Sequence, residues 1–317
     1  MKKAFTLLLF LSSQFSFSQN LVPNWSFEDT VSCPTQYSEI SKSVGWSDYD
    51  GSPDYFNSCS SLMGVPANGV GFQYARTGSA YGGFITFAKY ASNAREVMGI
   101  QLIESLAIGQ KYFVSFYVSR AFSSSNQTIY YINAASNKIG ARFSTVSYYD
   151  YSFVNRNPVP IDNHAQVFTD SIITDTLNWV KISGSFVADS SYKYVCFGNF
   201  FTDSATKPLF LDTAAADAYY YIDDITVSTD SLMADKEILK NSSVDIFPNP
   251  TMNIINIVNN STDVFNLTVY SVLGKQIFKE SINERETSID LTNYSKGIYF
   301  LQIDEKGGMI QKKIVKY

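Results

Sequence analysis

The stretch from Tyr219 to Val227 constrains the fold of this chain more than any other. It reads Tyr-Tyr-Tyr-Ile-Asp-Asp-Ile-Thr-Val, and such a run of aromatic and β-branched residues is typical of a β-strand. Because side chains alternate along a strand, the odd-numbered residues from Tyr221 to Val227 are expected on one face. That face ends in two β-branched residues, so we expect it to point into the core with Asp223 on it. A buried carboxylate needs a hydrogen-bond partner or a cation.

The same β signals recur through residues 20–228, with almost no helix signal. Three more runs are rich in aromatic and β-branched residues, namely 111–119, 179–187 and 192–200. Turns containing Gly, Ser, Asn and Asp separate them, and no strand–helix–strand rhythm is present. The pattern predicts an all-β domain of the jelly-roll or sandwich kind over residues 20–228.

A second β pattern begins after a break in the alternation. Residues 229–243 are charged and lose the strand pattern, so we interpret them as a linker. Residues 244–317 then show about seven short strands with turn signals between them, which predicts a small immunoglobulin-like β-sandwich.

The first 19 residues indicate export. Two lysines precede a short apolar run that ends at Leu11, and Ser-rich residues follow as far as Gln19. This is the pattern of a secretory signal peptide, expected to be cleaved near Gln19. The alternative, a membrane anchor, needs a longer apolar run, so no transmembrane segment is expected.

Charge and cysteine content narrow the classes of partner and site. A net charge of -5 and a pI of 5.0 provide no basic surface for nucleic acid. In an oxidising compartment Cys33 and Cys59 are candidates for a disulfide, worth about 3–4 kcal/mol in the chain-entropy model. Cys196 lies in an apolar strand pattern and is expected in the core. With one histidine in the chain, a metal site built on Cys and His is not expected.

The last 74 residues carry a specific set of motifs. These are Pro248-Asn-Pro250, Val269-Tyr-Ser-Val-Leu-Gly-Lys275, Gly297-Ile-Tyr-Phe-Leu301 and Lys312-Lys-Ile-Val-Lys-Tyr317. In this order they resemble the type A C-terminal sorting domain of Bacteroidetes type IX secretion substrates. The resemblance implies that the type IX machinery is a partner, and that the protein reaches the outer cell surface or the medium. It also implies removal of this domain. The alternative is an ordinary immunoglobulin-like domain with a stabilising role.

Residues 20–228 resemble the galactose-binding-like jelly rolls that serve as carbohydrate-binding modules. The opening Asn24-Trp-Ser-Phe-Glu28 and the closing Tyr221-Ile-Asp-Asp-Ile225 carry the resemblance, although Trp25 departs from the usual small residue or proline. In that fold the first and last strands are neighbours. The resemblance implies a structural calcium ion held by Glu28 and Asp223, with backbone carbonyls completing an all-oxygen shell. The alternative is that Glu28 caps a turn and Asp223 accepts hydrogen bonds from backbone amides.

A narrower resemblance covers the segment from Cys33 to Gly82. Its Gly, Pro and aromatic spacing, including Gly51-Ser-Pro-Asp-Tyr-Phe-Asn-Ser-Cys59, is similar to a domain of Bacteroidetes surface proteins. The resemblance supplies no biochemical role, but it supports a bridge between Cys33 and Cys59.

Ligand binding on a jelly roll commonly uses exposed aromatic rings that stack on sugar faces. Five aromatic residues fall outside clean strand patterns and are candidates for this role, namely Trp46, Tyr55, Tyr148, Tyr149 and Tyr151. The chain has 22 Tyr and 24 Phe, so many rings must simply pack in the core.

The expected function is therefore that of an exported, non-catalytic surface or secreted protein that binds a glycan or another surface ligand. One alternative is an adhesive or structural protein that binds other proteins. A less favoured alternative is an enzyme acting on polysaccharides through Asp48, Asp50 and Asp54, which lie near Trp46.

A short pattern, Asp followed by Ser or Thr and a small or aliphatic residue, occurs six times before the sorting domain. It resembles the Bacteroidetes O-glycosylation sequon, so we expect at least two of the hydroxyl residues to be modified; the candidates are Thr30, Ser171, Thr176, Ser204, Thr213 and Ser231. The alternative is that these pairs form turns at strand ends.

Overall fold

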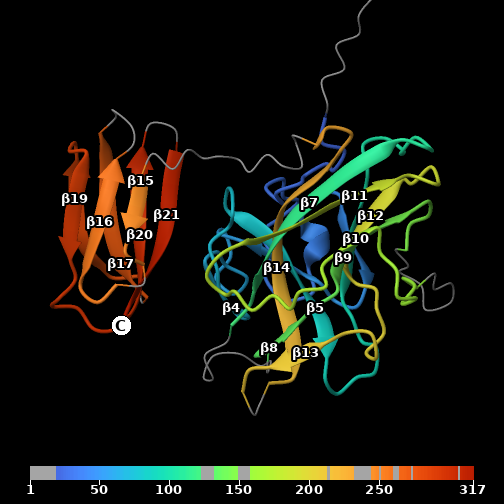
Figure 1. Ribbon diagram of the computed structural model, residues 1–317, viewed down its shortest axis with the longest axis horizontal. Coiled ribbons are helices and arrows are strands. Elements are labelled where there is room, and N and C mark those ends of the chain that lie inside the picture. The colour runs from blue at the N-terminus through green and yellow to red at the C-terminus, as the bar shows by residue number, and fades with distance from the viewer. Residues whose placement is uncertain are drawn as a thin grey trace, which may run out of the picture.

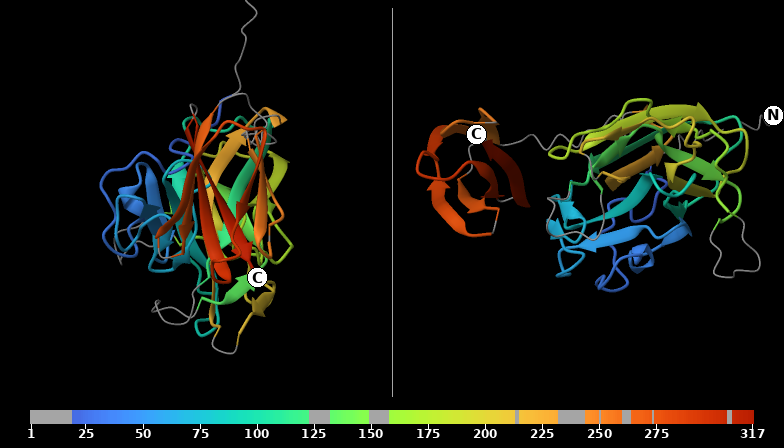
Figure 2. Two further views of the ribbon diagram at one scale, coloured as in Figure 1. Left: turned by 90° about the vertical axis from the view of Figure 1, so that its left-hand side faces the viewer. Right: turned by 90° about the horizontal axis from the view of Figure 1, so that it is seen from below.

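The computed structural model describes residues 19–122, 132–148, 158–212, 215–231, 244–249, 251–259, 264–272, 274–305 and 308–317. The signal-peptide prediction and most of the predicted linker lie outside these ranges. Figures 1 and 2 show two β bodies along the chain, a large one and a small one. Each has its own apolar core. The expected all-β class, a jelly-roll sandwich followed by an immunoglobulin-like sandwich, is confirmed.

Two five-stranded antiparallel sheets form the large domain. The first has the order β1-β6-β12-β9-β10, with bounds Trp46–Asp50, Val97–Gln101, Tyr194–Asn199, Ile139–Ser144 and Val167–Phe168. The second has the order β11-β7-β14-β5-β2, with bounds Val180–Val187, Lys111–Arg120, Asp217–Ser228, Ala80–Ala88 and Asp54–Asn57. The side chains between the sheets form the main core, where Phe27 stacks on Trp46 at 4.5 Å and Phe116 meets Phe197 edge-on at 5.2 Å.

Strand β14 contains a bulge that changes which face its side chains take. Asp224 has a φ of 50°, and the pairing with β7 advances three residues on β14 for two on β7, from Asp223–Tyr117 to Thr226–Ser115. An extra residue in one strand reverses the alternation beyond it.

The bulge corrects one sequence-based expectation. Tyr221 belongs to an outer cluster of aromatic residues, whereas Ile225 and Val227 point into the main core. Tyr221 and Val227 therefore do not share a face. Asp223 is nevertheless fully buried, because segments cover both faces of this sheet.

The chain's opening segment lies beside the end of β14, as the jelly-roll resemblance implied. The Leu21 amide donates to the Val227 carbonyl at 2.8 Å, and the Ile225 amide donates to the Trp25 carbonyl at 3.0 Å. The Asn20 side chain adds two bonds to β14, since it donates to the Ile225 carbonyl and accepts from the Val227 amide.

Residues 58–79, between β2 and β5, cover part of the outer face of the second sheet. They contain the short hairpin of β3 (Ala67–Asn68) and β4 (Gly71–Phe72), and the 3-10 helix η1 (Ile40–Lys42) precedes β1. Met63 and Val70 pack there against residues of β2, β5 and β14, namely Phe56, Tyr81, Tyr219 and Tyr221. A separate two-stranded sheet, β13 (Pro208–Phe210) on β8 (Ala134–Ser136), lies at another edge of the large domain (Figure 1).

The small domain is a sandwich of three strands against four. The order β15-β16-β19 comprises Val244–Phe247, Ile254–Asn259 and Glu286–Asp290. The order β18-β17-β20-β21 comprises Gln276–Ile282, Phe265–Ser271, Gly297–Glu305 and Gly308–Lys316. Buried aliphatic residues fill the space between, among them Ile257, Leu267, Val269, Leu301 and Ile303.

Candidate functional site

Three carboxylates, one from the opening segment and two from β14, hold one turn, Arg76–Ala80. The Glu28 carboxylate accepts hydrogen bonds from the Ser79 and Ala80 amides and from the Ser79 hydroxyl. Gly78, with a φ of 65°, allows the close approach, since a Cβ there would lie 2.3 Å from the Glu28 carboxyl carbon.

Asp223 and Asp224 hold the first half of the same turn. Asp223 accepts hydrogen bonds from the amides of Arg76, Thr77 and Asp224. Asp224 pairs with the Arg76 guanidinium and accepts a hydrogen bond from the Thr77 hydroxyl. Burial and the neighbouring Asp224 carboxylate raise the pKa of Asp223.

This arrangement matches the hydrogen-bonding alternative to calcium that the sequence left open. Glu28 and Asp223 hold the same turn, but the groups facing their oxygens are N–H and O–H donors. A calcium shell consists of oxygen ligands, and the described residues contain no cluster of three or more His, Cys, Asp or Glu able to hold a metal. The donor set does not fit a calcium ion, and calcium binding stays a prediction.

Two of the five aromatic residues predicted to bind ligand are core residues, so their prediction as exposed rings is wrong. Trp46 is 2% exposed and donates its indole N–H to the Asn24 carbonyl. Tyr55 is fully buried and donates its hydroxyl to the Phe27 carbonyl. Both residues lie on strands rather than loops, since Trp46 opens β1 and Tyr55 lies in β2.

Tyr148 is also buried, and its ring packs edge-on against Tyr49 at 6.1 Å. It belongs to a cluster of buried residues on the outer face of the first sheet, so its prediction as an exposed platform is wrong as well. Tyr149 and Tyr151 lie outside the described residues.

The predicted Cys33–Cys59 disulfide is present, and Cys196 is a buried free thiol as expected. Of the six predicted glycosylation sites, Thr30, Ser171 and Ser204 are exposed, Thr176 and Ser231 are partly buried, and Thr213 lies outside the described residues. Modification at these sites stays a prediction.

Asp54 and Glu96 form a buried pair of acids in the large domain. The sequence did not single them out as a pair. Asp54 accepts hydrogen bonds from the Tyr219 hydroxyl and the Ser38 amide, and Glu96 accepts them from Ser52 and the Ile85 amide. Burial raises the pKa of Asp54 to about 6. Burial, followed by repulsion from Asp54, raises the pKa of Glu96 to about 7. Asp54 thus lies inside the fold and not in a loop.

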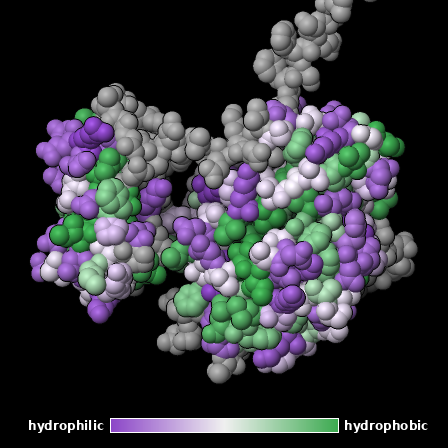
Figure 3. Space-filling model, in the orientation of Figure 1, coloured by the Kyte–Doolittle hydropathy of each residue, from purple (hydrophilic) through white to green (hydrophobic). Residues whose placement is uncertain are grey.

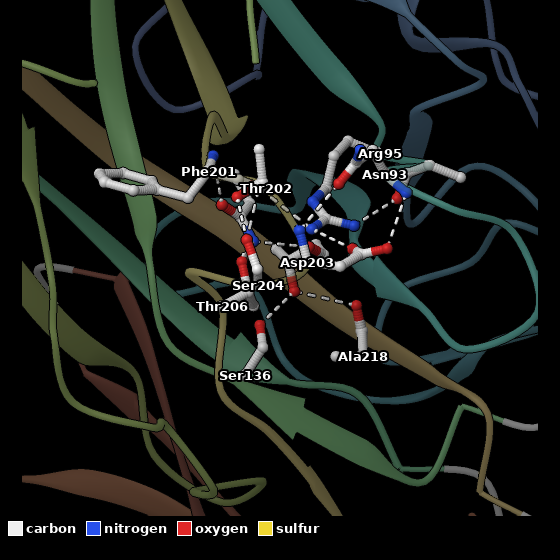
Figure 4. A network of polar contacts seen from close by, with 12 residues as sticks. Asn93, Arg95, Ser136, Phe201, Thr202, Asp203, Ser204, Thr206 and Ala218 are labelled. Atoms are coloured by element: carbon white, nitrogen blue, oxygen red, sulfur yellow. Dashed lines mark hydrogen bonds and ion pairs between the residues drawn. The ribbon is translucent and has the colours of Figure 1, made fainter. Parts of the chain in front are cut away.

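The loop between β5 and β6 is fixed to the 201–206 turn by polar contacts (Figure 4). The Asp203 carboxylate accepts hydrogen bonds from the Arg95 guanidinium at 2.7 Å and from the Asn93 amide at 2.8 Å. The Asp203 amide in turn donates a hydrogen bond to the side-chain oxygen of Asn93 at 2.8 Å. Asn199 links this turn to β5 by donating to the Thr86 carbonyl and to Thr206.

The β5–β6 loop and the neighbouring strand β13 bring a cation close to two exposed rings. We call Lys89, Tyr90 and Phe210 the Lys89 platform. The Lys89 ammonium lies 5.4 Å from the centroid of the Tyr90 ring and 4.7 Å from that of Phe210. Tyr90 is 81% exposed and Phe210 is 38% exposed. Tyr90 follows β5 in a loop of small polar residues, so the argument applied to Tyr148 would also have selected it.

Three comparisons with known proteins give more information on the sorting domain than on the large domain. Residues 245–317 match the family model described as the secretion system C-terminal sorting domain. A search of curated proteins found no match.

Two solved structures show limited similarity. An immunoglobulin-like β-sandwich protein of the DUF3244 family from Bacteroides vulgatus is 15% identical over 24% of this chain and 85% of its own, with a TM-score of 0.22. The CBM22-1–GH10 modules of Clostridium thermocellum endo-1,4-β-D-xylanase 10B, complexed with xylohexaose, are 11% identical over 58% of this chain. That match spans 26% of the xylanase chain with a TM-score of 0.30.

The tail's motifs, its seven-stranded sandwich and the family match agree. Within the described residues, no helix is long and apolar enough to cross a membrane. The chain is a type IX secretion substrate with a C-terminal sorting domain at residues 245–317, exported to the outer cell surface or the extracellular space.

Proposed function

We propose that the large domain is a non-catalytic glycan-binding domain and that the Lys89 platform is its binding surface. The observation that carries this proposal is the exposure of Tyr90 and Phe210, two rings that both lie close to the Lys89 ammonium. The C–H faces of a pyranose ring pack well against aromatic faces, and large rings supply contact area at little entropic cost.

Lys89 suggests the class of glycan. Its ammonium donates to the Ala215 carbonyl at 3.4 Å, and the ion pairs found among the described residues do not include it. An available cation between two rings favours a sugar that carries a carboxylate or a sulfate.

Rigidity supports the same proposal. The Arg95–Asp203 ion pair and the reciprocal Asn93–Asp203 hydrogen bonds fix the loop that carries Tyr90 to the turn that precedes β13, the strand of Phe210. Phe210 also packs edge-on against Phe87 at 6.2 Å. A surface held in place before binding loses less conformational entropy when a ligand arrives.

The test is binding of the full chain to an array of neutral and acidic polysaccharides. We expect Tyr90→Ala and Phe210→Ala each to weaken binding about tenfold, and Lys89→Gln to weaken binding of acidic glycans selectively. Phe168→Ala is the matched control, because Phe168 is 37% exposed beside Lys138, whose charge Asp170 already pairs. If the Tyr90→Ala/Phe210→Ala double variant binds as tightly as the wild type, the platform is not the site.

One observation favours a protein ligand as the second candidate. Strand β13 pairs, in the described part of the chain, with β8 alone, and Leu209, Phe210 and Leu211 are each at least 38% exposed. In Figure 3, apolar side chains lie over the lower part of the large domain, where Figure 1 places β8 and β13. An apolar edge strand can pair with a strand of another chain. Leu209→Lys would abolish such pairing and leave glycan binding unchanged.

A further inference from the structure

The face of the sorting domain that points away from its own core carries a ring that is not exposed. In β20, Tyr299, Leu301 and Ile303 belong to the tail's apolar core, so alternation places Phe300 on the opposite face. Phe300 is nevertheless only 4% exposed.

The large domain covers this ring with two rings of its own. Phe300 stacks on Phe72 with centroids 4.4 Å apart and planes at 20°, and it meets Tyr74 edge-on at 5.1 Å. Phe72 and Tyr74 stand at 86° to each other, so they form a corner into which Phe300 fits. β4 lies on the side of the large domain that faces the tail (Figure 1).

The corner is built into the large domain and fixed by buried bonds. Gln73 lies between the two rings in the sequence and points inward. Its side-chain amide donates to the Ser119 hydroxyl, and its backbone carbonyl accepts from the Tyr81 hydroxyl. The Trp179 indole donates to the Tyr74 carbonyl at 3.0 Å. These contacts involve no residue of the tail, so the large domain itself holds the two rings in position.

The direction of the pKa shift of Tyr74 agrees with a corner that the tail covers. Burial and the nearby Tyr270 of the sorting domain raise the pKa of Tyr74. Tyr270 pairs with Phe300 across β17 and β20, so two rings of the tail face two rings of the large domain.

We propose that the sorting domain is an intramolecular cap. Phe300 occupies an aromatic corner of the large domain, made by Phe72 and Tyr74, and departure of the tail exposes these two rings. The corner is separate from the Lys89 platform and does not depend on the function proposed for it.

Cysteine crosslinking in the full chain tests the seating of the tail. We expect the Phe72→Cys/Phe300→Cys pair to form a disulfide at least about tenfold faster than Phe72→Cys/Ile254→Cys, because docking holds the first pair in contact and so raises its effective concentration. Ile254 is the matched partner, since it is 50% exposed on the opposite sheet of the same domain. Equal rates for the two pairs would overturn the proposal.

A second measurement tests release. Phe300→Asp places a charge in the corner and leaves the tail's own core intact. In the full chain we expect it to increase the radius of gyration in small-angle X-ray scattering and the fluorescence of bis-ANS, a dye that binds exposed apolar surface. Adding Phe72→Ala and Tyr74→Ala should remove the gain in fluorescence but not the expansion. Unchanged scattering and unchanged fluorescence in Phe300→Asp would contradict the cap.

Discussion

The two domains differ in what lies at their centres. The large domain buries six charged residues that take part in its polar contacts, namely Asp54, Arg95, Glu96, Arg120, Asp223 and Asp224. In the described part of the sorting domain, Lys316 is the one buried charged residue, and its ammonium donates to the Tyr294 carbonyl. The tail's core is otherwise aliphatic and aromatic.

This difference predicts two kinds of sensitivity. A domain held together through partnered buried charges loses stability when one partner is removed or titrated. A domain held together by apolar burial responds to cavities and is insensitive to pH. The three tryptophans, Trp25, Trp46 and Trp179, all lie in the large domain, so their fluorescence reports the unfolding of that domain alone.

The largest effect is expected from Asp223→Ala. The change removes the acceptor of three amides, from Arg76, Thr77 and Asp224, and leaves them without that partner. We expect the free energy of unfolding of the large domain to fall by about 3–5 kcal/mol, measured by urea titration with tryptophan fluorescence.

Asp290→Asn in the sorting domain is the control. Asp290 accepts a hydrogen bond from the Thr292 amide on the exposed surface of the tail. The variant should leave both unfolding transitions unchanged. A large domain that tolerates Asp223→Ala as well would remove the contrast between the two domains.

The next effect is a pH dependence confined to the large domain. The ordinary pKa values of 3.8 and 4.5 rise to about 6 for Asp54 and about 7 for Glu96 in the folded state. The folded state binds these protons more tightly than the unfolded state. The two acids therefore contribute their full stabilisation of the folded state below about pH 4, and this contribution is lost as the pH rises through about 6 and 7. We expect the free energy of unfolding to be roughly 3 kcal/mol lower at pH 8 than at pH 5.

Comparison with Glu96→Gln isolates the contribution of the acid pair from that of other titrating groups. This variant should lose more than half of the pH dependence and gain stability at pH 8. Glu104→Gln, at an exposed position, is the control and should keep the full dependence. A stability that rises between pH 5 and pH 8 in the wild type would show that the two acids are not buried together as described.

The smallest effect is expected from chelation. A bound ion whose free concentration is a hundred times its Kd would add about 2.7 kcal/mol to the free energy of unfolding of the large domain. The N–H and O–H donors around Glu28 and Asp223 instead favour a change near zero when EDTA is added to the full chain. A clear fall in the unfolding midpoint, reversed by calcium and absent in Glu28→Gln, would establish the ion that the sequence predicts.

The contrast between the two domains also explains where sequence patterns predicted the fold correctly and where they did not. In the tail, side chains alternate along short strands, and the turn motifs around Pro248 and Gly274 fall between strands, so pattern and fold agree. In the large domain the pattern placed Asp223 inside correctly but for an incorrect reason, because the bulge at Asp224 reverses the faces of β14. A bulge depends on the pairing partner, and the partner is not visible in the strand's own sequence.

The sequence by itself determined the β class, the two-domain division, the Cys33–Cys59 pairing and the export signal in the tail. These depend on local periodicity, on composition and on motifs that are contiguous in the chain. Tertiary structure decided which aromatic residues face solvent: it buried Trp46, Tyr55 and Tyr148 and left Tyr90 and Phe210 exposed. The physical reason is that distant segments cover the outer faces of both sheets, so exposure depends on which segment lies on top of a ring.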